Sequence, residues 1–436
     1  MFPKSRRPSE RFCAAASCGG LTWQFLPRVG WGTIHVTSWD VGANVMITRV
    51  DAKNYRCLRS VSVPLRPFQI LVGPNGSGKS AFMDVLCFIQ ALVSRGLEAA
   101  VKDRTEPIGS FHDLIWRRED SSFSLGIEAE IPQVKRLQSE VHSFSHLRYD
   151  VTVRTEPKLD VPLIDTETVA LLDRTHAETL TIAARTHTHV QYVGEDGSPH
   201  LCGPEINPRT SVLSYRPPEP TLFPASMWFA TLLREEIRNV TLRPDDLHAP
   251  STLEAERTSR LTGANLAWSV SELREKSRDS FEAWMRHLRT ALPDLETIRA
   301  EPWPQGRSRY LVLRYKNGIE VPSRVVSDGT LCLLALTILA YMPESNLVYL
   351  IEEPENAVHP TAVDTIYQSL SSLYESQVLM ASHSPILLGL AKKEELLCFS
   401  ATAEGTRIVP GADHPVLQEW KGEVSLSDLF AAGVLG

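Results

Sequence analysis

The sequence lacks several features that would place it in a secreted, membrane or basic nucleic-acid-binding class. No apolar run approaches the roughly 20 residues of a bilayer-spanning helix, and the basic start has no apolar stretch long enough for a secretory signal. Its seven cysteines, an odd number without a repeated C-x-x-C spacing, argue against a disulfide framework or a zinc site. The formal net charge of −7 does not imply nucleic-acid binding. We therefore expect a cytoplasmic protein with reduced thiols and no membrane association.

Histidines cluster in one part of the chain without the other residues that a metal site usually needs. The four in question are His176, His187, His189 and His200. No carboxylate or cysteine pattern accompanies them, so we do not expect them to bind a metal.

The 436 residues, 43% of them hydrophobic and 22% charged, are enough for two or three cores. Residues 1–45 show no sustained period, whereas a regular pattern begins at Met46. We expect 1–45 to be a poorly ordered extension, with Met46 as a candidate first residue. Residues 131–300 mix short strand-like pieces with helices that their periodicity predicts over 224–239 and 265–292. They have no glycine-loop chemistry and lack the heptads of a long coiled coil. We expect a mixed α+β insertion there, with a partner-binding role, between the two halves of one domain, 46–130 and 301–436.

The sequence around residues 73–80 fits the pattern G-x-x-x-x-G-K-[ST]. The apolar run Phe68–Val72 before it predicts a buried strand, and apolar spacings of three and four after it predict a helix. Such a loop directs backbone N–H groups at a phosphate. Lys79 would reach the β- and γ-phosphates, and the Ser80 hydroxyl would be a ligand of Mg²⁺. The predicted ATP contacts here are Asn75, Gly76, Ser77, Gly78, Lys79 and Ser80.

Two acids follow a second apolar strand, Leu347–Ile351. A strand that is apolar throughout is typical of a parallel sheet covered on both faces. Consecutive strand residues face opposite ways. We therefore expect Glu352 to hold Mg²⁺ and Glu353 to orient and deprotonate the attacking water.

A serine-led segment, Ser327–Thr330, precedes the apolar helix predicted over 331–341. Its hydroxyl, the Gly329 N–H and the helix dipole could stabilise a phosphate. An ordinary helix N-cap would use the same residues. The segment alone leaves both interpretations open.

Taken in order, these motifs resemble those of known ATPases. The run of strand, Asn54–Arg59 loop, strand and glycine loop resembles the opening of SMC, RecF and OLD ATPase heads. Ser327–Thr330 sits where ABC-class ATPases carry their signature motif, and Glu352–Glu353 has the form of a Walker B motif. Pro354–Pro360 closely resembles a PEN-x-hydrophobic-HP loop. The chain is identified on these motifs as an OLD-like AAA ATPase of the ABC class. The resemblance implies an α/β P-loop NTPase fold with a mixed α+β insertion.

The resemblance also assigns roles to residues. It implies that Asn54, Arg56 and Arg59 contact the base or phosphates, although a solvated loop explains them equally well. It places His383, after the strand Val378–Ala381, at the γ-phosphate as a catalytic residue beside Lys79 and Glu353. A γ-phosphate-sensing glutamine is expected near residues 115–119, and the sequence has none there.

The resemblance implies a homodimer in which Ser327 and Gly329 complete the ATP site of the other subunit. ATP binding would close the dimer and hydrolysis would release it. We expect control of a separate effector, such as a nuclease, in phage defence or DNA repair and maintenance, with DNA as a candidate ligand, because the chain has no room for the TOPRIM nuclease of OLD proteins. A nucleotide-gated scaffold with little turnover and an ABC transporter subunit remain alternatives.

Overall fold

The computed structural model divides the chain into two units, residues 1–41 and 42–436. The residues that the structure describes all belong to the second unit, so the expected extension over 1–45 lies outside them. The described ranges are 46–132, 143–156, 161–186, 189–195, 197–200, 207–215, 222–252, 260–304, 306–344, 346–420 and 424–435.

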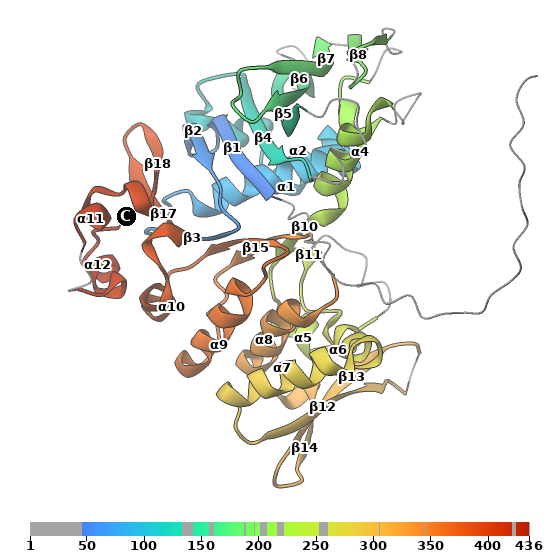
Figure 1. Ribbon diagram of the computed structural model, residues 1–436, viewed down its shortest axis with the longest axis vertical. Coiled ribbons are helices and arrows are strands. Elements are labelled where there is room, and N and C mark those ends of the chain that lie inside the picture. Colours follow the sequence, from blue (N-terminus) through green and yellow to red (C-terminus); the bar gives the residue numbers. More distant parts are fainter. Residues whose placement is uncertain are drawn as a thin grey trace, which may run out of the picture. The chain divides into compact units, whose positions relative to one another are not determined.

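A seven-stranded, mainly parallel sheet forms the centre of this unit (Figure 1). In spatial order its strands are β11 (Arg260–Leu261), β10 (Ile237–Val240), β15 (Val348–Glu352), β16 (Gln377–Ala381), β3 (Phe68–Val72), β17 (Leu396–Thr402) and β18 (Gly405–Pro410). All neighbours are parallel except the terminal hairpin of β17 and β18. The sheet confirms the predicted α/β P-loop NTPase fold.

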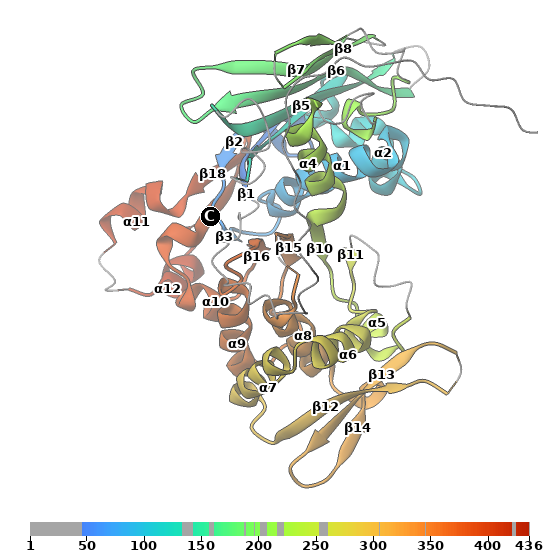
Figure 2. The same cartoon turned by 45° about the vertical axis from the view of Figure 1, so that its right-hand side comes forward.

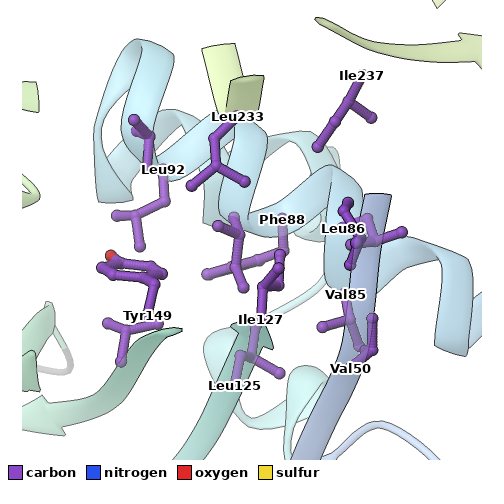
Figure 3. Packing of buried hydrophobic residues seen from close by; sticks show 14 of the residues in the cluster. Val50, Val85, Leu86, Phe88, Leu92, Leu125, Ile127, Tyr149, Leu233 and Ile237 are labelled. Carbon is purple, nitrogen blue, oxygen red and sulfur yellow. The ribbon is translucent and has the colours of Figure 1, made fainter. Parts of the chain in front are cut away.

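Both faces of the parallel sheet are buried, which explains its apolar strands. In β3, Leu71 belongs to one core, whereas Ile70 and Val72 belong to the other. Helix α1 (Lys79–Arg95) lies in the first core. Figure 3 shows its side chains, including Phe88, packed against Ile127 and Tyr149 of a second sheet. Helix α1, which follows the glycine loop, is therefore packed between the two sheets.

The second sheet is antiparallel and lies across α1 (Figure 2). Its order is β2 (Leu58–Pro64), β1 (Met46–Tyr55), β4 (Ser122–Glu130), β5 (Phe144–Glu156), β6 (Val161–Asp173), β7 (Thr179–Thr186), β8 (His189–Val193) and β9 (Pro199–His200). Residues predicted as two separate segments, 46–130 and 131–300, thus contribute strands to one sheet.

The other face of the parallel sheet is covered by helices, two of which also pack against a three-stranded sheet. These helices are α5 (Pro244–His248), α6 (Leu266–Lys276), α7 (Arg278–Ala291), α8 (Asp328–Thr337), α9 (Pro360–Ser371) and α10 (Pro385–Leu390). The small sheet has β12 (Leu295–Pro302), β13 (Arg309–Tyr315) and β14 (Glu320–Pro322). The remaining helices are α2 (Leu97–Thr105), α4 (Pro224–Thr231), α11 (Pro415–Glu419) and α12 (Leu426–Ala431). No helix among the described residues has both the length and the apolar character needed to cross a membrane.

Three local expectations were wrong in detail. The loop expected over 54–59 is a tight turn, because Tyr55 pairs with Leu58 and extends both strands. The helix expected over 224–239 ends in a π-helical turn and becomes β10, whose Ile237 pairs with Val348. The helix expected over 265–292 breaks at Ser277 into α6 and α7. Strands β10 and β11, which lie within the segment 131–300, also belong to the central sheet. The domain boundaries at 131 and 300 stay a prediction.

Candidate nucleotide site

A cavity of about 370 Å³ opens at the carboxyl ends of β3, β15 and β16. Parallel strands bring residues that are far apart in the sequence to this edge, and in open α/β sheets this edge is the usual ligand site. The cavity is lined by Arg56, Cys57, Asn75, Gly76, Gly78, Lys79, Ser80, Ala81, Glu352, Glu353, Ala381 and His383.

The glycine loop lies directly against neighbouring backbone and the hairpin of β17 and β18. Gly78 has a φ of +103°, and a Cβ there would lie 2.3 Å from Thr406 Oγ1. A larger residue at this position would have to move the Thr406 side chain and would be strained by the positive φ. Ser77 is buried beneath the loop, and its hydroxyl has no hydrogen-bond partner among the described residues. Helix α1 begins at Lys79 without an acidic residue in its first turn, so its N-terminal N–H groups suit an anion.

Lys79 is held inside its own loop. Its ammonium group donates to the carbonyl oxygens of Gly73 at 2.7 Å and Pro74 at 3.0 Å. Burial lowers the pKa of Lys79, and the negative charges of Glu353 and Glu352 oppose that shift. Phosphate oxygens would supply further negative partners to this buried cation, so the residue fits a phosphate-bearing ligand.

Ser80 and Glu352 face each other across the cavity floor. The Ser80 hydroxyl donates to Glu352 Oε2 at 3.3 Å. Burial raises the pKa of Glu352, the Ser80 hydrogen bond opposes this, and Glu353 adds to it. A hydroxyl and a carboxylate are oxygen ligands of the kind that Mg²⁺ prefers. The pair therefore fits the expected metal.

Glu353 has different side-chain partners from Glu352. Its backbone has a φ of +47°, a conformation that is uncommon outside glycine and that gathers at functional sites. The side-chain amide of Asn356 donates to one carboxylate oxygen, and the other lies 3.8 Å from His383 Nε2. The two adjacent acids thus have different partners, as separate roles would require.

Glu355 organises the end of β16, a function that the sequence did not reveal. Its Oε1 accepts from the Ser382 hydroxyl at 2.7 Å and from the His383 N–H at 2.9 Å. These bonds link the loop after β15 to the loop that carries His383. The resemblance of Pro354–Pro360 to a known loop gave no sign of this contact, because Ser382 lies 27 residues away.

Arg56 reaches the cavity, whereas Asn54 and Arg59 do not line it. Arg56 forms an ion pair with Asp84 at 3.2 Å. The Asn54 amide donates to Asp120 at 2.8 Å, and Arg59 pairs with Glu404 at 3.5 Å. Residues 115–119, which lack the sensing glutamine, are likewise absent from the lining.

Asp84 holds Arg56 from the second turn of α1. It also accepts a hydrogen bond from the Tyr55 hydroxyl at 2.6 Å and from Arg104 Nε at 2.9 Å. Burial, reinforced by Asp84, raises the pKa of Tyr55, so the tyrosine remains a donor. The position of Asp84, four residues after Ser80 on the same helix face, is the only sequence signal that could have indicated it.

The structure does not bring Ser327 and Gly329 to the glycine loop of the same chain, since neither lines the cavity. Ser327 is exposed and is the N-cap of α8, where its hydroxyl accepts from the Thr330 N–H at 3.4 Å. Gly329 packs on the loop after β15: a Cβ there would lie 2.2 Å from the Ala357 carbonyl oxygen. Within one chain, both residues have structural functions.

Two family descriptions match parts of this chain. Residues 46–116 match "AAA ATPase domain", and residues 214–389 match "AAA domain, putative AbiEii toxin, Type IV TA system". An OLD nuclease from Thermus scotoductus is 45% identical over 38 residues. That alignment spans 9% of this chain and only 7% of the relative.

Solved structures of SMC heads are similar over most of the chain at low identity. One is an SMC head bound to the C-terminal winged-helix domain of ScpA, 14% identical, with a TM-score of 0.49, covering 83% of this chain and 96% of that one. Another, an SMC head with an extended coiled coil bound to the C-terminal domain of ScpA, from Pyrococcus furiosus, is 12% identical, with a TM-score of 0.46, covering 89% and 98%. The SMC head domain from Thermotoga maritima is 12% identical, with a TM-score of 0.36, covering 84% and 98%.

Proposed function

We propose, on the premise that this chain is a P-loop ATPase of the AAA type resembling OLD and SMC ATPases, that it binds and hydrolyses Mg²⁺-ATP at the ends of β3, β15 and β16. One observation carries the proposal. Lys79, Glu352 and His383 come from three separate segments, and adjacent parallel strands bring them to one cavity.

Each residue of the cavity would have its own role in phosphoryl transfer. Lys79 would exchange the carbonyls of Gly73 and Pro74 for phosphate oxygens, and the N-terminus of α1 would hold the remaining charge. Ser80 and Glu352 would hold Mg²⁺, which neutralises phosphate charge when bound.

Glu353 would hold the attacking water and take its proton, while Asn356 fixes the orientation of the carboxylate. His383 would contact the γ-phosphate from the neighbouring loop, where Glu355 holds its backbone. The 3.8 Å between Glu353 and His383 would place the water and the γ-phosphate near one another.

The direct test is phosphate release by wild type, Lys79→Ala and Lys392→Ala. Lys392 is a matched control, because it is largely exposed and lines no part of the cavity. We expect the Lys79 variant to lose ATP binding and turnover and the control to keep both. Turnover at the wild-type rate in Lys79→Ala would contradict the assignment.

A second copy would complete the site. Ser327 is exposed at the start of α8 and does not line the nucleotide cavity of its own chain, so it would be free to contact a phosphate held by another molecule. An ATP-dependent homodimer with two composite sites is thus the assembly we propose.

The proposal of an effector rests on the names of similar proteins rather than on the geometry of the site. One family description names a toxin of a type IV toxin–antitoxin system, and one relative is named a nuclease. On that basis we propose that dimer closure controls a separate effector in phage defence or DNA maintenance. Because the alignment covers only 7% of that nuclease, nuclease activity is not part of the proposal for this chain.

A nucleotide-gated scaffold is the alternative that one observation favours. The Lys79 ammonium group and the Ser80 hydroxyl already have hydrogen-bond partners within the protein, so the pocket keeps its arrangement whether or not ATP is hydrolysed. The same phosphate-release assay separates the two functions, since a scaffold would bind ATP with no steady-state release.

A further inference from the structure

Three side chains able to bind a metal meet on the antiparallel sheet. They are Glu128 on β4, His146 on β5 and His176 in the turn between β6 and β7, and their ligand atoms all lie within 4.8 Å of one another. Strands β4, β5 and β6, the last of which leads into the turn with His176, are neighbours in the sheet (Figure 1). None of these residues lines the nucleotide cavity, so the cluster is separate from the proposed ATP site.

Strand register places the first two ligands on one face. Glu128 is opposite Arg148, and His146 lies two residues before Arg148 on the same strand. Residues two apart on a strand point the same way, so Glu128 and His146 are diagonal neighbours. His176 returns to this face through a turn in which its φ is +58° and its N–H donates to the Asp173 carbonyl at 3.1 Å.

The spacing is close to what a tetrahedral ion requires. Metal–ligand bonds of about 2.1 Å put two ligands of a tetrahedral site about 3.4 Å apart. His176 Nε2 lies 3.5 Å from Glu128 Oε1, which matches this edge. All three ligand atoms lie within 4.8 Å of one another, so no separation exceeds the ideal edge by more than about 1.4 Å, a distance that side-chain rotation can close.

The surroundings hold the ligands in place. The Glu128 side chain is only 4% exposed, and its Oε1 accepts from the Thr48 hydroxyl at 3.2 Å. The Ser145 hydroxyl lies 2.8 Å from His146 Nδ1 and orients that ring. Outer contacts of this kind fix the ligands of metal sites. Arg148 Nη1 approaches Glu128 Oε2 at 3.9 Å, too long for a strong hydrogen bond.

The two imidazole rings lie beside one carboxylate, with their centroids 5.4 Å apart. A divalent ion binds imidazoles in their neutral form, so both rings could serve as ligands of one ion.

We propose that Glu128, His146 and His176 bind a divalent transition ion of the Zn²⁺ class. Two imidazoles and a carboxylate suit such an ion better than Mg²⁺ or Ca²⁺, which prefer oxygen ligands. With three protein ligands, a fourth position is left for water or a group from a partner. The ion would tie β4 and β5 to the β6–β7 turn.

The test uses the tag-free full chain, stripped of metal. Zn²⁺ is titrated in competition with a chromophoric chelator, with excess Mg²⁺ present to occupy Ser80 and Glu352. We expect one Zn²⁺ per chain, with affinity lowered about tenfold or more in His146→Ala and His176→Ala. His189→Ala is the control, because this exposed histidine of β8 is not in the cluster, and it should bind as wild type does.

Cobalt gives a second readout, since Co²⁺ in this site should show visible absorption that His176→Ala loses. His176 is exposed in a turn, so this variant should keep the wild-type melting temperature in the presence of chelator. If His146→Ala does not fold, His176→Ala decides the question alone. Equal Zn²⁺ affinity in wild type and His176→Ala would overturn the proposal, whatever the ATPase assay gives.

Discussion

Gly329→Ala is the substitution that most sharply tests the packing between α8 and the loop after β15. The added methyl would lie 2.2 Å from the Ala357 carbonyl oxygen and 3.3 Å from Val358 Cα. A relaxed carbon–oxygen contact is about 3.3 Å or longer, so a group must move by about 1 Å. Ala357 already has a φ of +63°, so its loop has little freedom to yield.

The expected magnitude follows from two opposing effects. Overpacking of this kind costs about 1–3 kcal/mol. Replacing glycine by alanine within a helix returns up to about 1 kcal/mol, and less in a first turn. Gly389→Ala in α10 isolates the second effect, because its new methyl would have no heavy atom within 4 Å. The difference in unfolding free energy between the two variants should therefore be about 1–3 kcal/mol, with Gly329→Ala the less stable.

Urea denaturation of both variants, followed by tryptophan fluorescence without nucleotide, measures this difference. Gly329→Ala should also reduce ATP turnover more than Gly389→Ala does, because displacement of α8 moves Ser327 away from its position for a second subunit. Equal denaturation midpoints for the two variants would refute the close contact on which the argument rests.

Two further predictions concern the start of α8. Ser327→Arg should leave ATP binding to the monomer intact but prevent formation of the ATP-dependent dimer, as measured by light scattering. Ser327→Ala, which loses only the N-cap, should lower the free energy of unfolding by about 1 kcal/mol and still dimerise. Dimerisation of both variants would show that Ser327 is a helix cap alone. His248 lies 2.7 Å from Asp328 Oδ1 and 2.9 Å from the Ser323 carbonyl, and the hydrogen bond with Asp328 is the main cause that raises the pKa of His248 above its ordinary 6.5. Because the pKa of His248 is raised in the folded state, this stabilisation is complete below pH 6.5 and is lost as the pH rises through the folded-state pKa. The difference in melting temperature between wild type and His248→Ala should therefore shrink from pH 6 to pH 9. A gap that widens with pH would contradict the charge state given to His248.

The nucleotide site could be predicted from the sequence where its signals are local. The strand Phe68–Val72, the glycine loop and α1 follow one another in the chain, so their order alone predicts a phosphate-binding site at the start of a helix. The acids after β15 could also be found, because they directly follow an apolar run of the kind that is typical of a parallel sheet covered on both faces.

Contacts between distant segments could not be predicted in the same way. The bonds from Glu355 to Ser382 and His383 depend on the pairing of β15 with β16, which no local pattern specifies. The strand β10 was read as the end of a helix, because a short apolar run fits either period until its neighbour, β15, is known. The Glu128 cluster was missed for the same reason: its carboxylate comes from β4, 48 residues before His176 in the sequence.

The central claim is that Glu353 is the catalytic base and Glu352 the metal ligand. Glu353→Gln keeps the side-chain size and should retain ATP, while the single-turnover rate falls by about 10²- to 10⁴-fold through loss of general-base help. Glu352→Gln should instead lose Mg²⁺ dependence and nucleotide retention together, since Ser80 then has no charged partner at the metal position. Single-turnover hydrolysis on both variants, with nucleotide counted after gel filtration, measures this directly. The account predicts that Glu353→Gln elutes as an ATP-loaded dimer, and hydrolysis by that variant at the wild-type rate would contradict it.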